Sequence, residues 1–331
     1  MPLSFNTEAK SVLRTNWAKA ILSFLHETTG KKLFYLGLPS EEALDIQEWL
    51  EHLDIIYAFK CREYPKMSDE SQSREKVLAL DDLLRELNRQ KRIRNFEVFD
   101  GYIEEVVLRG YDNSPTPKEF LQYDTVTVYN LDYCNSITSP LEFTDNVGDV
   151  KTAYKFEAVK KLMEMQAALP FPSKKFVLFL TIHCSFNDAN TSSFQGNPPD
   201  EKIKDYFNKI NSLTKGGKAP YLLKAFVFYN LSQFFLANNF LPEFLPVTHY
   251  IGNGNKPLLF FTVLGTQIEA KAGIPTSLQR ANEFLTRSFL SIEKNNFTNN
   301  TNLLAHGEIE WQNTNPLVLF KNSKTYQRYW G

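Results

Sequence analysis

The sequence predicts an α/β protein with a Rossmann-like, mostly parallel sheet, helices on both faces and a C-terminal antiparallel hairpin. Three observations lead to this fold class. Short apolar runs alternate with segments in which apolar residues recur at helical spacing. The run Phe176–Ile182 is continuously apolar, as expected of a parallel strand covered on both faces. Further along, two apolar runs flank an Asn-Gly turn at residues 252–255, which is typical of an antiparallel hairpin.

The expected elements follow one another along the chain. A helix over residues 7–28, which begins at Thr7, precedes the first strand, Leu33–Gly37. Ser40 is expected to cap a helix over Glu41–His52. The other strands are expected at Ile55–Lys60, Phe96–Phe99, Asp124–Leu131, Phe176–Ile182, Leu245–Ile251 and Leu258–Gly265. The other helices are expected at Ser73–Lys91, 150–168, Asp200–Leu213, Tyr221–Ala237 and 275–295, with polar loops at 110–119, 186–199 and 295–302.

The domain organisation follows from the absence of an internal repeat and of a clean linker. We expect an N-terminal helix over residues 1–30, one domain over 31–270, and a C-terminal helical and aromatic extension over 271–331 that packs on it. A chain of 331 residues, of which 43% are hydrophobic, is long enough to bury a large core without disulfides or metals.

Charge and cysteine content narrow the class of protein. Lys and Arg number 37 against 38 Asp and Glu, so the formal charge of −1 gives no overall drive toward nucleic acid and leaves only a local basic patch. The three cysteines, Cys61, Cys134 and Cys184, form no Cys-x-x-Cys pair, which favours free thiols in a reducing compartment. The first residues lack a signal-peptide core, and no apolar window is long enough to span a membrane. We therefore expect a cytoplasmic protein without membrane contact.

Small and polar residues stand where the expected strands end. In an open parallel sheet, ligands bind at the carboxyl ends of the strands. Gly37 and Leu38-Pro39-Ser40 follow the first strand, Glu63 lies after the second, and Asp100-Gly101 follows the third. The fourth strand is followed by Asp132-Tyr133-Cys134-Asn135-Ser136.

This order of elements, over about residues 31–265, resembles the class I S-adenosylmethionine-dependent methyltransferase fold, with degenerate motifs. The resemblance implies S-adenosylmethionine as the cofactor. It assigns cofactor-binding roles to Gly37, Pro39, Ser40, Glu63, Asp100 and Gly101. The turn after the first strand has one glycine where the family has three, and an ordinary strand–helix turn is the alternative interpretation. Likewise, Glu63 can be an exposed loop residue, and Asp-Gly is also a plain turn signal.

The resemblance places reacting groups at the end of the fourth strand. It makes Asp132, Tyr133 and Asn135 the catalytic candidates, with the acid positioning the methyl acceptor. The two prolines of amino-group methyltransferases are absent here, and the segment is somewhat similar to the Leu-Asp-x-aromatic-Gly-Ser version of some tRNA guanine methyltransferases. Cys134 lacks the Pro-Cys context and the general base that a nucleophile needs, so we interpret it as a buried thiol.

Three further features have two interpretations each. His183-Cys184 is too small a set for zinc, and a histidine satisfied near the cleft is the simpler interpretation. Residues 186–199 follow a strand end and could form a lid or a target-reading loop. The last residues, KTYQRYWG, either stack on bases or anchor the C-terminus through their aromatic rings.

Two hypotheses about function follow. The first is an S-adenosylmethionine-dependent methyltransferase-like protein that acts on nucleic acid, through a local patch, or on a small molecule. The second is a catalytically inactive Rossmann-like subunit of a larger bacterial complex for nucleic-acid processing or antiviral defence, which would bind protein partners. Another nucleotide-binding α/β fold is a third hypothesis, which the terminal hairpin disfavours. No metal is expected under the first two.

Overall fold

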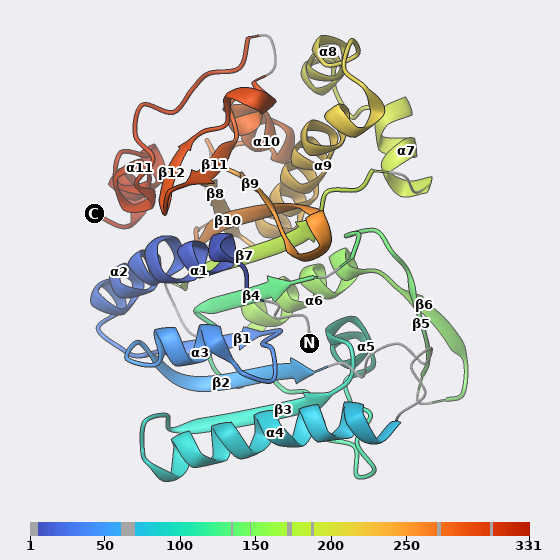
Figure 1. Ribbon diagram of the computed structural model, residues 1–331, viewed down its shortest axis with the longest axis vertical. Helices are drawn as coiled ribbons and strands as arrows, with labels where there is room; N and C mark the ends of the chain where they lie inside the picture. Colours follow the sequence, from blue (N-terminus) through green and yellow to red (C-terminus); the bar gives the residue numbers. More distant parts are fainter. Residues whose placement is uncertain are drawn as a thin grey trace. The chain divides into compact units, whose positions relative to one another are not determined.

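The structure is a computed structural model that describes most of the chain (Figure 1). The described ranges are 6–60, 70–133, 135–145, 147–170, 174–186, 189–269, 273–304 and 307–331. Its contacts divide the chain into two compact units. The parallel-sheet unit comprises Leu22–Asp132 and Ser139–Phe171. The antiparallel-sheet unit comprises Met1–Ile21, Tyr133–Thr138 and Pro172–Gly331.

The parallel-sheet unit is built on four parallel strands in the order β3-β2-β1-β4. The strands are β1 (Leu33–Gly37), β2 (Leu53–Lys60), β3 (Asn95–Asp100) and β4 (Val128–Asp132). Every residue of β1 is buried, because this strand lies between β2 and β4 and is covered on both faces. A separate two-stranded antiparallel sheet, β5 (Leu141–Thr144) and β6 (Val150–Ala153), belongs to the same unit.

The helices of this unit follow from the strand order. The chain steps from β1 through β2 to β3 in one direction and then crosses back to β4 on the other side of β1. Since crossovers between parallel strands are right-handed, this reversal sends later helices to the opposite face. The helices α3 (Leu44–Trp49) and α4 (Glu70–Arg89) precede the reversal, and α5 (Ile103–Arg109) and α6 (Lys155–Ala168) follow β3 and β4 (Figure 1). The expected α/β class, with helices on both faces of a mostly parallel sheet, is confirmed.

The antiparallel-sheet unit is built around the long strand β10 (Pro257–Gln267). Three strands pair with β10 in antiparallel fashion: β7 (Lys175–His183), β8 (Phe240–Phe244) and β9 (Thr248–Ile251). The turn of the β9–β10 hairpin contains the 3₁₀ turn Asn253–Asn255. The C-terminal hairpin expected from the Asn-Gly turn is therefore confirmed. A second hairpin, β11 (Leu290–Glu293) and β12 (Asn296–Asn299), extends the sheet beyond β9.

Six α-helices of the antiparallel-sheet unit lie in the described residues after β7. They are α7 (Ala189–Gly196), α8 (Glu201–Lys209), α9 (Lys215–Ala237), α10 (Ser277–Leu285), α11 (Pro316–Lys321) and α12 (Lys324–Tyr329), with a 3₁₀ turn at Thr301–Leu303. At the N-terminus, α1 (Glu8–Val12), a π-helical segment (Leu13–Ala18) and α2 (Lys19–Thr29) follow one another. Thr7 begins this run as expected, since its hydroxyl accepts the N–H of Lys10 at 3.2 Å. None of the described helices has the length and hydropathy that a membrane crossing requires.

Several expected elements are wrong. Residues 189–196 form helix α7 instead of a loop, because Phe194 packs on Phe226 of α9 with ring centroids 5.2 Å apart. The helix expected over 275–295 ends at Leu285, and the segment expected to be loose after it forms the β11–β12 hairpin. The local pattern did not reveal these elements, because tertiary packing decides short helices and strands. The domain boundaries expected from the sequence stay a prediction.

Candidate functional site

Strand register brings the expected cofactor-binding positions of the parallel-sheet unit to one edge. Gly37 at the end of β1 pairs with Ala58 of β2 and with Asn130 of β4. Lys60, the last residue of β2, pairs with Asp100, the last residue of β3. The carboxyl ends of all four strands therefore meet at the same edge of the sheet.

The missing side chain of Gly37 is explained by packing inside the sheet. A Cβ atom at this position would lie 2.5 Å from the carbonyl oxygen of Asn130 and 2.6 Å from the hydroxyl of Tyr35. The same Asn130 oxygen accepts the N–H of Leu38 at 3.0 Å, which holds the turn against β4. Gly37 is therefore required by the close approach of β1 to β4, independently of any ligand at the turn.

The turn after Gly37 differs from the expected strand–helix connection. Pro39 is buried and has no N–H group, and Ser40 is half-buried. Ser40 does not cap the following helix, so that expectation is wrong: α3 begins at Leu44 with Ala43 at the N-cap, and no side chain caps it. The carbonyl of Ser40 instead accepts the N–H of Ala43, which adopts left-handed backbone angles (φ 46°, ψ 42°). The turn therefore uses the N–H of Ala43 within its own backbone.

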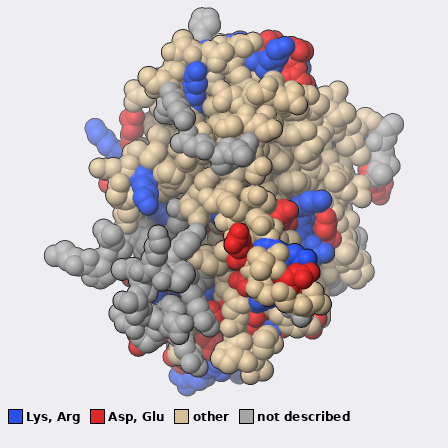
Figure 2. All heavy atoms as spheres, turned by 90° about the vertical axis from the view of Figure 1, so that its right-hand side faces the viewer, with Lys and Arg blue, Asp and Glu red and all other residues tan. Residues whose placement is uncertain are grey.

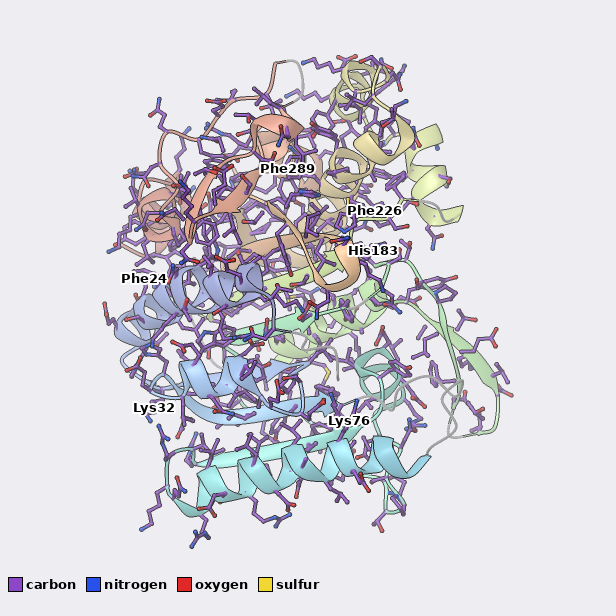
Figure 3. The ribbon with its side chains drawn as sticks, viewed as in Figure 1. Phe24, Lys32, Lys76, His183, Phe226 and Phe289 are labelled. Carbon is purple, nitrogen blue, oxygen red and sulfur yellow. The ribbon has the colours of Figure 1, made fainter. Side chains whose placement is uncertain are left out.

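An ion pair joins this turn to the end of β2. The ammonium group of Lys60 donates to a carboxylate oxygen of Glu41 at 3.1 Å, and the ammonium group of Lys76 on α4 lies 3.9 Å from the other oxygen. Figure 3 labels Lys76 on the side where the arrow of β2 ends, opposite Lys32 at the start of β1. Burial alone would raise the pKa of Glu41, but a hydrogen bond from its own backbone and the two lysines lower that pKa below its ordinary value of 4.5. Glu41 is therefore an ionised acceptor at neutral pH.

A buried amide connects β4 to the start of α3. The Nδ2 group of Asn130 donates to Asp45 at 2.7 Å and to the hydroxyl of Tyr35 at 3.3 Å. Because Asn130 is 6% exposed, these bonds satisfy a polar group that would be costly to bury alone. The contacts hold α3 against the ends of β1 and β4.

The Asp100–Gly101 corner ends β3 with a fixed backbone. Asp100 is 8% exposed, and the N–H of Gly101 donates to the carbonyl of Lys60 at 3.1 Å. Gly101 has φ +144°, and a Cβ there would lie 3.0 Å from Nδ2 of Asn113. The carbonyl of Asp100 accepts the N–H of Asn113 at 2.6 Å. The residue type at 101 is therefore required both by the backbone angle and by the neighbouring side chain.

A closed triangle of side chains holds Asn113 in place. Its Nδ2 donates to Glu105 at 2.7 Å, and its Oδ1 accepts from Arg109 at 2.5 Å. Arg109 closes the triangle through an ion pair with Glu105 at 3.0 Å. The guanidinium also donates to the carbonyl of Tyr111, at 3.0 and 2.8 Å. Helix α5 and the loop after it therefore form a rigid support beside the corner.

The catalytic candidates are close in sequence but are divided between the two compact units. Asp132 is half-buried at the end of β4 in the parallel-sheet unit. Tyr133 and Asn135 belong to the antiparallel-sheet unit, where the N–H of Tyr133 donates to Thr181 and the carbonyl of Asn135 accepts from His183. The cofactor candidate Glu63 and the thiol candidate Cys134 lie outside the described residues. The roles of these candidates stay predictions.

The His183–Cys184 pair ends β7 in the antiparallel-sheet unit. Burial and the nearby ammonium group of Lys256 lower the pKa of His183, and burial raises the pKa of Cys184 to about 12. Within the part of the chain that the structure describes, no three His, Cys, Asp or Glu side chains gather as metal ligands would. The thiol is thus held in its protonated, unreactive form.

The C-terminal segment is an anchor, in agreement with one of its two interpretations. Trp330 is buried, and its indole N–H donates to the hydroxyl of Thr266 on β10. Its ring packs on Phe320 with centroids 5.0 Å apart, and Lys175 lies 5.0 Å above it. On the molecular face in Figure 2, acidic and basic side chains of the described residues lie side by side in the lower half of the view. Nucleic-acid binding through a local patch stays a prediction.

Three residues of the edge escaped the sequence reasoning: Glu41, Asp112 and Asn113. Glu41 looks like a first-turn acid of a helix, and its pairing with Lys60 depends on strand order. Asp112 and Asn113 fall in a polar loop, where the Asp-x-Ser pattern at 112–114 is a local signal for a side-chain-to-backbone turn. Such a pattern could have drawn attention to the loop without revealing what the loop supports.

Comparisons with known proteins add a family and a set of distant structural likenesses. The model of the PP_RS20740-like family matches residues 9–200. No curated protein matches the chain. Among solved structures, the O-methyltransferase from Bacillus cereus in complex with SAH is 10% identical over 78% of this chain and 83% of that chain, with a TM-score of 0.35. The RNA methyltransferase candidate PH1948 from Pyrococcus horikoshii is 11% identical over 77% and 84%, with a TM-score of 0.33. MccD protein is 9% identical over 76% and 97%, with a TM-score of 0.34. Values this low identify neither a substrate nor an activity.

Proposed function

The chain belongs to the PP_RS20740-like family, and from its methyltransferase-like fold we propose that it binds S-adenosylmethionine at the carboxyl edge of the parallel-sheet unit and acts as a methyltransferase. One observation carries the proposal. The strand order β3-β2-β1-β4 and its register bring the turn after Gly37, the end of β2 and the Asp100–Gly101 corner to one edge. In open α/β sheets, that edge is where ligands bind.

The donors and acceptors of this edge fit an adenosyl group. The ribose hydroxyls and the adenine amine are hydrogen-bond donors, and carboxylates are acceptors. Asp100 supplies a carboxylate at the end of β3, and Glu41 supplies one in the turn after β1, where it is paired with Lys60 of β2. Gly101 presents backbone without a side chain beside Asp100.

In the proposed reaction, bound S-adenosylmethionine supplies an electrophilic methyl group. Asp132, half-buried at the end of β4, would accept a hydrogen bond from the methyl acceptor and orient its nucleophilic atom. Proximity and orientation would supply most of the rate enhancement, and the proton that the acceptor loses on methylation would pass to Asp132 or to water. The proposed methyl acceptor is a nucleic acid or a small molecule, as expected from the sequence.

Calorimetric titration of the purified chain with S-adenosylhomocysteine and S-adenosylmethionine tests the proposal. We expect micromolar binding to the wild type and loss of binding in Asp100→Ala. Glu86→Gln is the matched control, because Glu86 is half-exposed on α4 and contacts its helix neighbours Arg89 and Gln90. Absence of heat with a folded wild type would refute cofactor binding by this chain.

A second candidate function is favoured by one specific observation. Part of the backbone in the turn after β1 has no donor for a ligand: the N–H of Leu38 donates to Asn130, Pro39 has no N–H, and the N–H of Ala43 donates to Ser40. A turn of this kind suits a non-catalytic subunit that keeps the fold without the cofactor. The titration separates the two functions, since the second predicts no binding of either adenosyl compound.

A further inference from the structure

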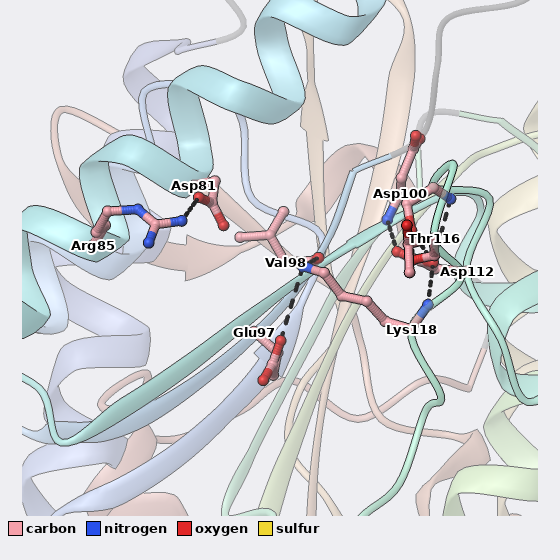
Figure 4. A network of polar contacts seen from close by, with 9 residues as sticks. Asp81, Arg85, Glu97, Val98, Asp100, Asp112, Thr116 and Lys118 are labelled. Carbon is pink, nitrogen blue, oxygen red and sulfur yellow. Dashed lines mark hydrogen bonds and ion pairs between the residues drawn. The ribbon is translucent and has the colours of Figure 1, made fainter.

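A buried carboxylate lies directly beside the Asp100–Gly101 corner. Asp112 is 2% exposed, and its Oδ2 accepts the backbone N–H of Asp100 at 3.1 Å (Figure 4). Its Oδ1 accepts the backbone N–H of Lys118 at 2.7 Å, and the backbone N–H and hydroxyl of Ser114 at 3.2 and 2.7 Å. One side chain therefore ties the end of β3 to the loop that follows α5.

The loop itself is held in place independently of Asp112. The ammonium group of Lys118 donates to the carbonyl of Val98 on β3 at 2.9 Å. Phe120 is buried, and its ring contacts those of Phe59 and Phe99 with centroids 5.4 Å from each. These contacts hold the loop against β3. The two oxygens of Asp112 have different tasks: Oδ1 accepts the hydrogen bonds that close the loop, and Oδ2 accepts the N–H of Asp100.

The corner needs such support because of its place in the sheet. Among the described strands, β3 pairs only with β2, so the outer backbone groups of β3 find their partners outside the sheet. The N–H of Asp100 is one of these, and Asp112 supplies its acceptor. The carbonyl of Asp100 meets the N–H of Asn113, the next residue of the same loop. Both backbone groups of Asp100 therefore depend on residues 112 and 113.

We propose that Asp112 is the positioning residue of the adenosyl site: it orients the Asp100–Gly101 corner toward the ligand without touching the ligand. The inference rests on the proposed function. It adds that affinity for the adenosyl group depends on a residue in the loop after α5. A carboxylate suits the task because its two oxygens accept the backbone N–H groups of Asp100, Ser114 and Lys118, and an acceptor on both sides is what no neutral side chain of the same size offers.

The substitution Asp112→Asn separates the two tasks of the side chain. An asparagine keeps one carbonyl oxygen, which takes the place of Oδ1 and accepts from Ser114 and Lys118. Its amide nitrogen then faces the N–H of Asp100, so donor meets donor and the corner loses its bond. Ser114→Ala is the matched control, because it removes one donor on the loop side and leaves the bond to Asp100 intact.

Two measurements on the full chain test the inference: the exchange rate and chemical shift of the Asp100 amide by NMR, and the affinity for S-adenosylhomocysteine by calorimetry. We expect Asp112→Asn to accelerate amide exchange at Asp100 and to weaken binding, each about ten-fold, with an upfield shift of the amide proton. Ser114→Ala is expected to stay within about two-fold of the wild type in both.

The outcomes are distinguishable. If Asp112→Asn leaves the Asp100 amide as in the wild type, or behaves like Ser114→Ala, Asp112 only closes the loop and the inference is overturned. If the wild type and Asp112→Asn bind S-adenosylhomocysteine equally, the positioning role is overturned while the proposed function stands. If the wild type does not bind, the proposed function fails and the ligand-positioning role fails with it.

Discussion

Gly37→Ala is expected to destabilise the parallel-sheet unit, because the glycine is required by the packing of β1 against β4. The added Cβ would lie 2.5 Å from the carbonyl oxygen of Asn130, which is 0.5 Å inside the 3.0 Å limit that real Cβ contacts respect. The two strands must move apart, and the bond from the N–H of Leu38 to the same oxygen lengthens. Overpacking of this kind costs about 1–3 kcal/mol and the weakened hydrogen bond about 1, so the free energy of unfolding should fall by about 2–4 kcal/mol.

Equilibrium unfolding in urea, followed by circular dichroism, measures this loss. For a chain of this length the same loss corresponds to a fall in melting temperature of about 3–6 °C. Gly196→Ala, at the end of α7, is the matched control. A Cβ there meets no atom within 4 Å, so we expect a change within about 0.5 kcal/mol. The reasoning is wrong if Gly37→Ala is as stable as Gly196→Ala. Loss of adenosyl binding at full stability would mean that Gly37 serves ligand approach and not packing.

Three further predictions concern ionisable side chains that are buried or paired. Lys224→Met should lower the free energy of unfolding by about 3–5 kcal/mol, because it removes the ammonium group that lies 2.8 Å from the buried carboxylate of Glu308. Adding Glu308→Leu should recover most of this loss in urea unfolding, and a loss below about 1 kcal/mol for the single variant would contradict the pairing. The pKa of Glu41 is lowered, so its ion pair with Lys60 stabilises the fold above pH 4.5 and loses this effect as the pH falls below that value. Glu41→Gln should therefore make the free energy of unfolding depend less on pH in this acidic range, as measured by urea unfolding. Cys184, with a pKa of about 12, should resist iodoacetamide at pH 8 in the folded chain and react after unfolding in guanidinium, which peptide mass spectrometry detects. Rapid labelling of the folded chain would contradict the raised pKa.

The side-chain contacts of the candidate site join segments that are separate in the sequence. Glu41 meets Lys60 only because β1 and β2 are neighbours. Asp112 meets Asp100 only because the loop after α5 returns to the end of β3. No spacing rule in a single sequence links such pairs, since each depends on strand order and on the path of a loop.

The sequence by itself determined the fold class and the strands whose signal is local and strong. The apolar run at Leu33–Gly37 became β1 with the expected bounds, and the Asn-Gly turn gave the β9–β10 hairpin. These elements follow from hydrophobic periodicity and turn chemistry, which act over a few residues. The Asp100–Gly101 corner could also be predicted from the sequence, because these residues directly follow the expected strand Phe96–Phe99.

Only the tertiary structure decided what those residues do there. Gly37 proved to be required by the carbonyl of Asn130, 93 residues further along the chain. Ala43, and not Ser40, stands at the N-cap of α3, because the turn folds back on itself through a bond between the two residues. The short helix α7 and the β11–β12 hairpin likewise pack on distant partners: Phe194 contacts Phe226, and Phe297 contacts Trp17 with ring centroids 4.7 Å apart. Burial and contact are properties of the folded chain, and a local pattern cannot supply them.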